Sequence, residues 1–306
     1  MGKKKSTNSN GAARNGSLEV LKTYKMYVGG AFPRTESGRF YTPLANKKPL
    51  GNICLASRKD VRNAVKAARD AQPGWAGRTA YNRGQILYRI AEMLEGRREQ
   101  FQSELVRQGS TGTEAKKEVQ ASIDRLIVYA GWCDKYQQIF SSVNPVASSH
   151  FNFSVLEPMG VVFVVANETQ SLLGLISLVA PVIAGGNSCV VLASESRPLC
   201  AVTFGEVLGT SDVPGGVINI LTGKLAELTS HIARHMSLDG IAFDRKEAKV
   251  LTEIKQFAAD DIKRVRSYDA DWLQPESGSP YLIQDFSEVK TTWHPIEKIG
   301  TSGSGY

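Results

Sequence analysis

The sequence lacks the patterns that mark several large classes of protein. Its four cysteines form no CxxC pair and no regular spacing, so we predict neither a disulfide framework nor a cysteine zinc site, and expect buried thiols in a reducing, cytoplasmic setting. Its longest apolar stretches are too short, or too interrupted by polar residues, to span a membrane. It contains no HExxH metal motif and no GxGxxG nucleotide-binding fingerprint. A hydrophobic content of 42% instead fits an ordinary globular protein.

A basic stripe of the kind that binds nucleic acid is also missing from the body of the chain. The formal net charge is +7, but residues 1–22 hold five basic residues against Glu19 and so account for +4 of it. The remaining +3 needs no nucleic-acid partner to explain it. Residues 1–22 also have few large apolar side chains and no apolar signal region, so we expect a disordered basic tail.

The start of this tail fits the loose M-G-x-x-x-[ST] pattern of N-terminal acylation. One acyl chain beside three lysines is a sufficient membrane anchor, but the charged Lys3 directly after Gly2 weakens the match. A solvated tail on a cytoplasmic protein is the favoured interpretation. A mitochondrial or membrane-peripheral location is the alternative.

Turn and helix signals follow along the first half of the chain. Two strand-like runs flank the Gly-Gly pair at 29–30, which predicts a hairpin. Asp60 is predicted to cap a helix that ends near Pro73, and Thr79 opens a second helix. Thr111-x-x-Glu is a capping box that leads into a long third helix.

From residue 161 onward, β-branched runs alternate with helical segments. The predicted strands are Val161–Val165, Ser188–Leu192, Gly216–Leu221 and Gly240–Phe243. The predicted helices are 172–184, 198–208 and 225–234. Apolar strands without alternation are buried on both faces, and a repeated strand–helix order is typical of an α/β fold with a Rossmann-like, doubly wound parallel sheet. Such sheets bind ligands at the carboxyl ends of their strands.

Four blocks of residues resemble the NAD-dependent aldehyde dehydrogenases in order and spacing. They are Glu157–Val162, Val179–Asn187, Ser194-Glu195 and Pro214–Gly223. The resemblance covers Tyr24 to about Val265 and implies a domain shaped for NAD. It also implies that Ser194 and Glu195 could still meet a ribose hydroxyl, so these two residues are the predicted remnant of a cofactor site.

The same resemblance indicates that catalytic residues have been replaced. Thr169 stands where the family has the asparagine that binds the oxyanion, and Tyr268 stands where it has the general-base glutamate. Losing one oxyanion donor lowers a rate about a hundredfold to a thousandfold. The family lysine that contacts the ribose is Leu192, and the glycine-rich turn after the fourth strand reads Phe243-Asp-Arg-Lys-Glu-Ala. The bulk and the carboxylate of this turn disfavour a pyrophosphate, and Arg245 and Lys246 are predicted to be flexible charges.

The resemblance further implies a deletion that removes the family's nucleophilic cysteine. The chain passes from Asp269 almost directly to a segment, 286–293, that resembles the C-terminal assembly strand. Without an activated thiol there is no covalent intermediate, so the chain is predicted to be a pseudoenzyme with no catalytic residues. It is similar to the degenerate second module of the two-module family-sixteen enzymes.

These observations predict four regions. They are a tail at 1–22, an aldehyde-dehydrogenase-like NAD-binding domain at 23–270 with oligomerisation strands near 148–158, a linker at 271–280 in place of the catalytic domain, and a C-terminal oligomerisation strand and tail at 281–306. We expect a small antiparallel oligomerisation sheet beside the Rossmann-like sheet.

Three other patterns carry weaker signals. His231 and His235 have metal-ligand spacing but no third ligand, so we interpret them as exposed structural histidines and predict no metal site. Residues 216–224 resemble a phosphate loop only superficially, because their glycines bracket a strand. A local basic cluster is interpreted as a solvated helix face; its members are Arg245, Lys246, Lys249, Lys263, Arg264 and Arg266.

The leading functional hypothesis is a non-enzymatic assembly subunit. The segments 151–156 and 286–293 resemble the family's oligomerisation strands, and an uncovered strand edge calls for a partner. The expected partners are a second copy, an aldehyde-dehydrogenase-like subunit or a larger complex. The alternative is a sensor or regulatory subunit with residual, weak NAD(P) binding at Glu195, and an unrelated enzyme activity is the third reading. We expect no functional cofactor beyond such weak NAD binding.

Overall fold

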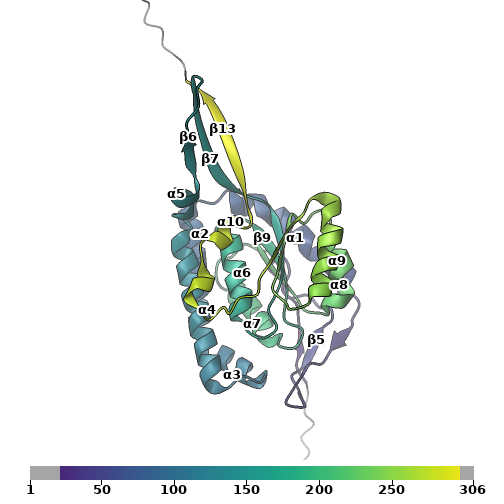
Figure 1. Ribbon diagram of the computed structural model, residues 1–306. Helices are drawn as coiled ribbons and strands as arrows, with labels where there is room; N and C mark the ends of the chain where they lie inside the picture. The colour runs from purple at the N-terminus through teal and green to yellow at the C-terminus, as the bar shows by residue number, and fades with distance from the viewer. Residues whose placement is uncertain (1–20, 297–306) are drawn as a thin grey trace, which may run out of the picture.

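Five parallel strands form the central sheet, in the order β10-β9-β8-β11-β12. In the computed structural model, which describes residues 21–296 of the chain, the sheet lies between two layers of helices (Figure 1). Its strands are β8 (Val161–Val165), β9 (Ser188–Leu192), β10 (Ile218–Leu221), β11 (Gly240–Phe243) and β12 (Arg264–Ser267). The predicted Rossmann-like α/β fold is therefore confirmed. Of the predicted tail, residues 1–20 lie outside the described residues.

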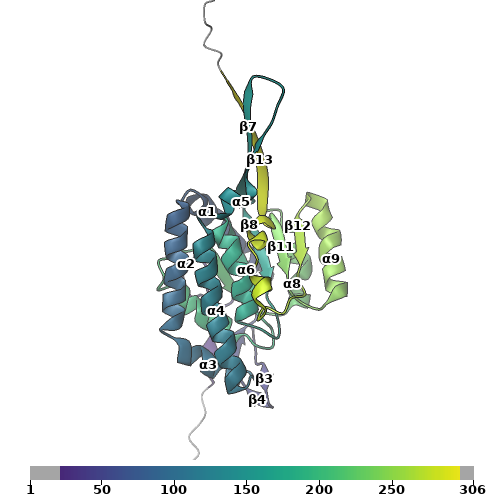
Figure 2. The same ribbon diagram turned by 60° about the vertical axis from the view of Figure 1, so that its left-hand side comes forward.

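The two faces of the sheet are covered by different helices. One face packs against α1 (Arg58–Ala76), α8 (Leu225–Ala233) and α9 (Ala248–Ala258). The other packs against α6 (Leu173–Ala184) and α7 (Leu199–Leu208), with α2 (Ala80–Glu95), α3 (Arg98–Arg107) and α4 (Gly112–Trp132) outside them. Figure 2 shows the outer helices on one side and α8 and α9 on the other.

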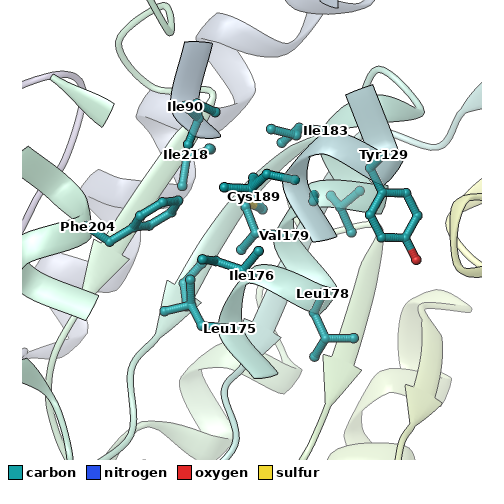
Figure 3. Packing of buried hydrophobic residues seen from close by; sticks show 14 of the residues in the cluster. Ile90, Tyr129, Leu175, Ile176, Leu178, Val179, Ile183, Cys189, Phe204 and Ile218 are labelled. Carbon is teal, nitrogen blue, oxygen red and sulfur yellow. The ribbon is translucent and has the colours of Figure 1, made fainter. Parts of the chain in front are cut away.

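Side chains of successive strand residues enter different cores, as the period of a strand requires. Val162 and Val164 belong to the larger core, whereas Val161, Phe163 and Val165 belong to the core beneath α1, α8 and α9. In the larger core, side chains of α6 pack with Cys189 of β9 and Ile218 of β10 (Figure 3); those labelled on α6 are Leu175, Ile176, Leu178, Val179 and Ile183. Burial on both faces explains the unbroken apolar runs in the sequence.

The N-cap of the first helix, α1, lies three residues earlier in the sequence than predicted. Ser57, and not Asp60, is its N-cap: Asp60 is the third helical residue and closes a capping box with Ser57. The helix also continues through Pro73 to Ala76. The predicted caps Thr79 and Thr111 are both confirmed.

A three-stranded antiparallel sheet projects from the body as an arm (Figures 1 and 2). Its order is β13-β7-β6, and its strands are β6 (Ser142–Asn144), β7 (His150–Pro158) and β13 (Ser287–Pro295). The pairing of β7 with β13 is continuous from Ser287↔Pro158 to Pro295↔His150. Both strands expected from the resemblance therefore form, and they pair with each other.

The remaining elements are short. They are β1 (Thr23–Tyr24), β2 (Phe40–Tyr41), β3 (Leu44–Ala45), β4 (Lys48–Pro49), β5 (Asn52–Cys54), α5 (Tyr136–Phe140), the 3₁₀ turns 259–261 and 275–278, and α10 (Tyr281–Gln284). Among residues 21–296, no helix is both long and apolar enough to cross a membrane.

The segment 271–280 is packed against the body. Trp272 is 1% exposed, and its backbone carbonyl accepts a hydrogen bond from Arg125 of α4 at 2.9 Å. Tyr129, one turn along α4, donates from its hydroxyl to the carbonyl of Ser279 at 2.9 Å. The predicted linker is thus held by α4 at both of its ends.

Candidate functional site

The candidate site lies at the carboxyl ends of the central strands. After β8, the chain adds β9 and then β10 on one side of β8. It then crosses over and adds β11 and β12 on the other side, so the strand order reverses between β8 and β11. A cleft of about 680 Å³ opens at this switch point. Its walls come from the loops after β8, β11 and β12; they are residues 167–170, 244–247 and 268–271. This is where a doubly wound sheet binds its ligand.

Arg245 is buried in the middle of the strand ends. Its side chain is 3% exposed, and it donates from Nε to the carbonyl of Ala166 at 3.1 Å and from Nη2 to the carbonyl of Ala193 at 3.0 Å. Its guanidinium also pairs with the carboxylate of Glu168 at 2.8 Å. The prediction of a flexible charge at Arg245 is therefore wrong, because strand-end carbonyls and a carboxylate fix its position. Lys246 is exposed and pairs with Asp269 at 3.0 Å.

Glu168 accepts hydrogen bonds from polar groups of the loop after β9. Its carboxylate accepts from the Ser194 hydroxyl at 2.7 Å, the Glu195 backbone N–H at 2.8 Å, and the Ser196 N–H and hydroxyl at 3.1 and 2.6 Å. Burial opposes its ionisation, but Arg245 and these hydrogen bonds prevail and lower the pKa of Glu168. Glu168 is thus an ionised carboxylate that ties the β8 loop to the β9 loop.

The two predicted cofactor residues therefore have different surroundings. The Ser194 hydroxyl is engaged inside the protein: it donates to Glu168 and accepts from the backbone N–H of Arg197 at 2.9 Å. Glu195 lines a separate cleft of about 430 Å³ together with Tyr41 and residues of the β3 region. Burial, opposed by Arg245, raises the pKa of the Glu195 carboxyl. Glu168, Arg245 and Glu247 line both clefts and so stand between them.

The residues at the predicted catalytic positions bind their own neighbours. The hydroxyl of Thr169 donates to the side-chain oxygen of Asn167 at 2.8 Å, and that oxygen also accepts the backbone N–H of Thr169 at 2.8 Å. The hydroxyl of Tyr268 donates to Asp285 at 2.9 Å, and burial raises the pKa of Tyr268. Each hydroxyl thus donates its proton to a side chain of the protein.

Asp244 is a fully buried carboxyl at the strand ends, 1% exposed. It accepts the indole N–H of Trp272 at 2.7 Å. Burial raises the pKa of Asp244 to about 6, and its hydrogen bonds to Trp272 and Asn167 limit the rise. Residues 271–272 therefore contact the candidate site through this indole and through Gln170, which donates to Asp271 at 2.6 Å and accepts the backbone N–H of Trp272 at 2.8 Å.

All four cysteines are free and buried, as predicted. Burial raises the pKa of Cys133 to about 12 and raises those of Cys189 and Cys200 as well. Buried thiols of this kind stay protonated and are poor nucleophiles. Within residues 21–296, no three His, Cys, Asp or Glu side chains come together in a way that could hold a metal ion.

The predicted basic cluster does not form one solvated helix face. Arg245 and Lys263 are buried, and Lys263 pairs with Asp261. Arg264 and Arg266 belong to the edge strand β12 and pair with Glu288 and Asp285. Sequence reasoning also missed Glu168, whose only local signal is a carboxylate three residues after the buried strand β8.

The sequence of this chain is similar to those of several known proteins. A sequence profile described as the aldehyde dehydrogenase family matches residues 33–267. The cytosolic 10-formyltetrahydrofolate dehydrogenase of Mus musculus is 29% identical over 255 residues, which are 81% of this chain and 28% of that protein. An aldehyde dehydrogenase of Aspergillus niger is 29% identical over 244 residues, 78% of this chain and 48% of that one.

The fold has a similar solved counterpart. The NAD⁺ complex of an aldehyde dehydrogenase from Bacillus cereus matches with a TM-score of 0.76 at 26% identity, over 80% of this chain and 50% of that one. The present chain thus spans half or less of the length of these relatives.

Proposed function

This chain belongs to the aldehyde dehydrogenase family, and we propose that it is a non-catalytic member that serves as a structural subunit, joined to other chains through its projecting arm. Two sets of contacts support the proposal. The polar network at the strand ends is satisfied within the protein, and the arm presents an uncovered strand.

The strand-end network supports the loss of dehydrogenase activity. By resemblance, Thr169 and Tyr268 occupy the positions of the oxyanion donor and the general base, and both hydroxyls are bound to neighbouring side chains. The segment between β12 and β13 is too short to hold a catalytic domain and is packed on α4. None of the buried cysteines borders the cleft at the switch point. We infer that the cleft has no nucleophile–base pair within residues 21–296.

The same network does not suit a dinucleotide. A cofactor lying across the strand ends would have to pass between the cleft at the switch point and the cleft at Glu195. The Arg245–Glu168 pair stands there, and Arg245 is held by two strand-end carbonyls as well. A diphosphate at the start of α9 would also meet the carboxylates of Asp244 and Glu247, whereas anions favour helix N-termini free of negative charge. We propose that the chain functions without a bound NAD(P).

The arm carries the assembly part of the proposal. β13 is an edge strand of nine residues, and its outer edge pairs with no other strand in the described part of the chain. Large apolar side chains are exposed along the arm; they are Val143, Phe151, Val289 and Trp293. An exposed apolar edge strand of this length is a template for pairing with another chain.

Affinity purification of the tagged full chain from its native cells tests the proposal. We expect a stoichiometric complex, with a native mass that contains either a second copy or another dehydrogenase-like chain. The purified material is assayed in parallel for NAD(P)-dependent aldehyde oxidation, and we expect none from this chain alone. A monodisperse monomer that co-purifies with nothing would contradict the structural role, and measurable oxidation would contradict the loss of activity.

A further inference from the structure

A positively charged cleft lies among α1, α8 and α9, and it shares no lining residue with the two clefts at the strand ends. Its volume is about 540 Å³. Its ionisable lining residues are Arg58, Arg62, Arg234, His231 and His235. Among residues 21–296, no aspartate or glutamate lines it, so the described part of the cleft presents charge of a single sign.

The three arginines differ from the other cations of the same surface. Lys59, Lys66 and Arg69 of α1 each have a carboxylate partner, at 2.8, 2.6 and 2.7 Å. Across residues 21–296, by contrast, the side chains of Arg58, Arg62 and Arg234 make no ion pair. Like charges gathered around one hollow repel one another, and a cleft lined by one sign of charge concentrates counter-ions. The missing carboxylates therefore point to an anionic ligand.

An aromatic ring forms one wall of the cleft and orients an arginine. The guanidinium of Arg234 lies 3.9 Å from the centre of the Phe257 ring, which is half-buried against the core beneath α9. Stacking fixes the plane of a guanidinium while its N–H groups remain able to donate. The cleft thus combines a positioned fork of donors with an apolar surface.

We propose that this cleft binds a small phosphate ester, with the phosphoryl group held by Arg62 and Arg234 and the organic part against Phe257. Guanidinium forks match the oxygens of a phosphoryl group, and a dianion balances several guanidiniums better than one carboxylate does. His231 and His235 add further ring N–H donors at the wall. This proposed binding site is separate from the strand-end clefts and from the arm.

Calorimetric titration of the full chain tests this proposal with phenyl phosphate, inorganic phosphate and phenol as probes. We expect phenyl phosphate to bind more tightly than inorganic phosphate, and phenol not to bind. The double variant R62A/R234A is expected to lower the affinity for phenyl phosphate at least about tenfold, because each arginine contributes charge-assisted hydrogen bonds. Arg34→Ala removes an exposed arginine outside the cleft and serves as the matched control.

A second variant tests the aromatic wall. Phe257→Leu is expected to bring the affinity for phenyl phosphate close to that for inorganic phosphate. Thermal unfolding without ligand is recorded for every variant, so that a loss of binding is compared only among folded proteins. Absence of phenyl phosphate binding by the wild-type chain, or equal binding by R62A/R234A and wild type, would overturn the proposal.

Discussion

Arg245 and Glu168 form an ion pair of 2.8 Å that joins the loops at the carboxyl ends of β8 and β11. The arginine side chain is 3% exposed and the glutamate side chain 32% exposed, so the pair is largely shielded from solvent. The carboxylate also accepts four hydrogen bonds from the loop after β9. A position where a doubly wound sheet ordinarily receives a ligand is therefore occupied by the protein's own polar groups.

Arg245→Ala is expected to destabilise the fold. The substitution leaves the Glu168 carboxylate without its cation and two strand-end carbonyls without their donor, and breaking a buried pair in this way costs about 3 kcal/mol. Urea unfolding followed by circular dichroism measures the change in the free energy of unfolding. Lys246→Ala, which removes the neighbouring exposed pair with Asp269, is the control and should have no measurable effect. Equal stability of both variants and the wild type would show that the buried pair is not structural.

Titration of the R62A/R234A variant, in which the cleft among α1, α8 and α9 cannot contribute, with NAD and NADP is expected to give no heat at millimolar ligand. The reason is that the Arg245–Glu168 pair separates the cleft at the switch point from the cleft that Glu195 lines. Binding that is abolished by Glu195→Gln would contradict this account. It would instead favour the alternative role as a nucleotide sensor.

Glu104 is expected to make stability fall as the pH rises. Burial raises its pKa to about 7, one carboxylate oxygen has no hydrogen-bond partner, and the other accepts from Thr203 at 2.7 Å. The folded state holds this proton more tightly than the unfolded state, whose pKa is near 4.5. The resulting stabilisation is complete below pH 4.5 and is lost as the pH rises to about 7.

Glu104→Gln tests this sign directly, because glutamine stays neutral and keeps the size of the side chain. The variant should be more stable than the wild type at pH 8, and the difference should shrink toward pH 5. Thermal unfolding midpoints across this range give the answer. A difference that does not vary with pH would mean that Glu104 is not the titrating group.

Trp272→Ala is expected to cost about 3–5 kcal/mol of unfolding free energy, as for other fully buried large side chains. The change removes a side chain that is 1% exposed and leaves the Asp244 carboxyl without its indole donor. Leu273→Ala, at a 43% exposed neighbour in the same segment, is the matched control. Denaturant unfolding of both variants is the measurement. If both lose little, residues 271–280 are a loose connection and not part of the core.

The central strands could be predicted from sequence because β8 and β9 are buried on both faces, which demands unbroken apolar runs. The edge strand β12 could not be predicted in the same way. Its sequence is Arg-Val-Arg-Ser, which contains no unbroken apolar run. The burial of Arg245 could not be predicted either. It depends on backbone carbonyls of Ala166 and Ala193, which are far apart in the sequence and meet only in the folded sheet.

The most direct test of the assembly role is the native mass of the complex purified with the double variant V289K/W293K. Both side chains are more than half exposed on β13, and lysines on an edge strand block pairing with another chain. V106K on α3 replaces an exposed valine far from the arm and is the control. The account predicts that V289K/W293K is recovered as a folded monomer while the wild type and V106K retain the complex. Recovery of the intact complex by V289K/W293K would contradict it.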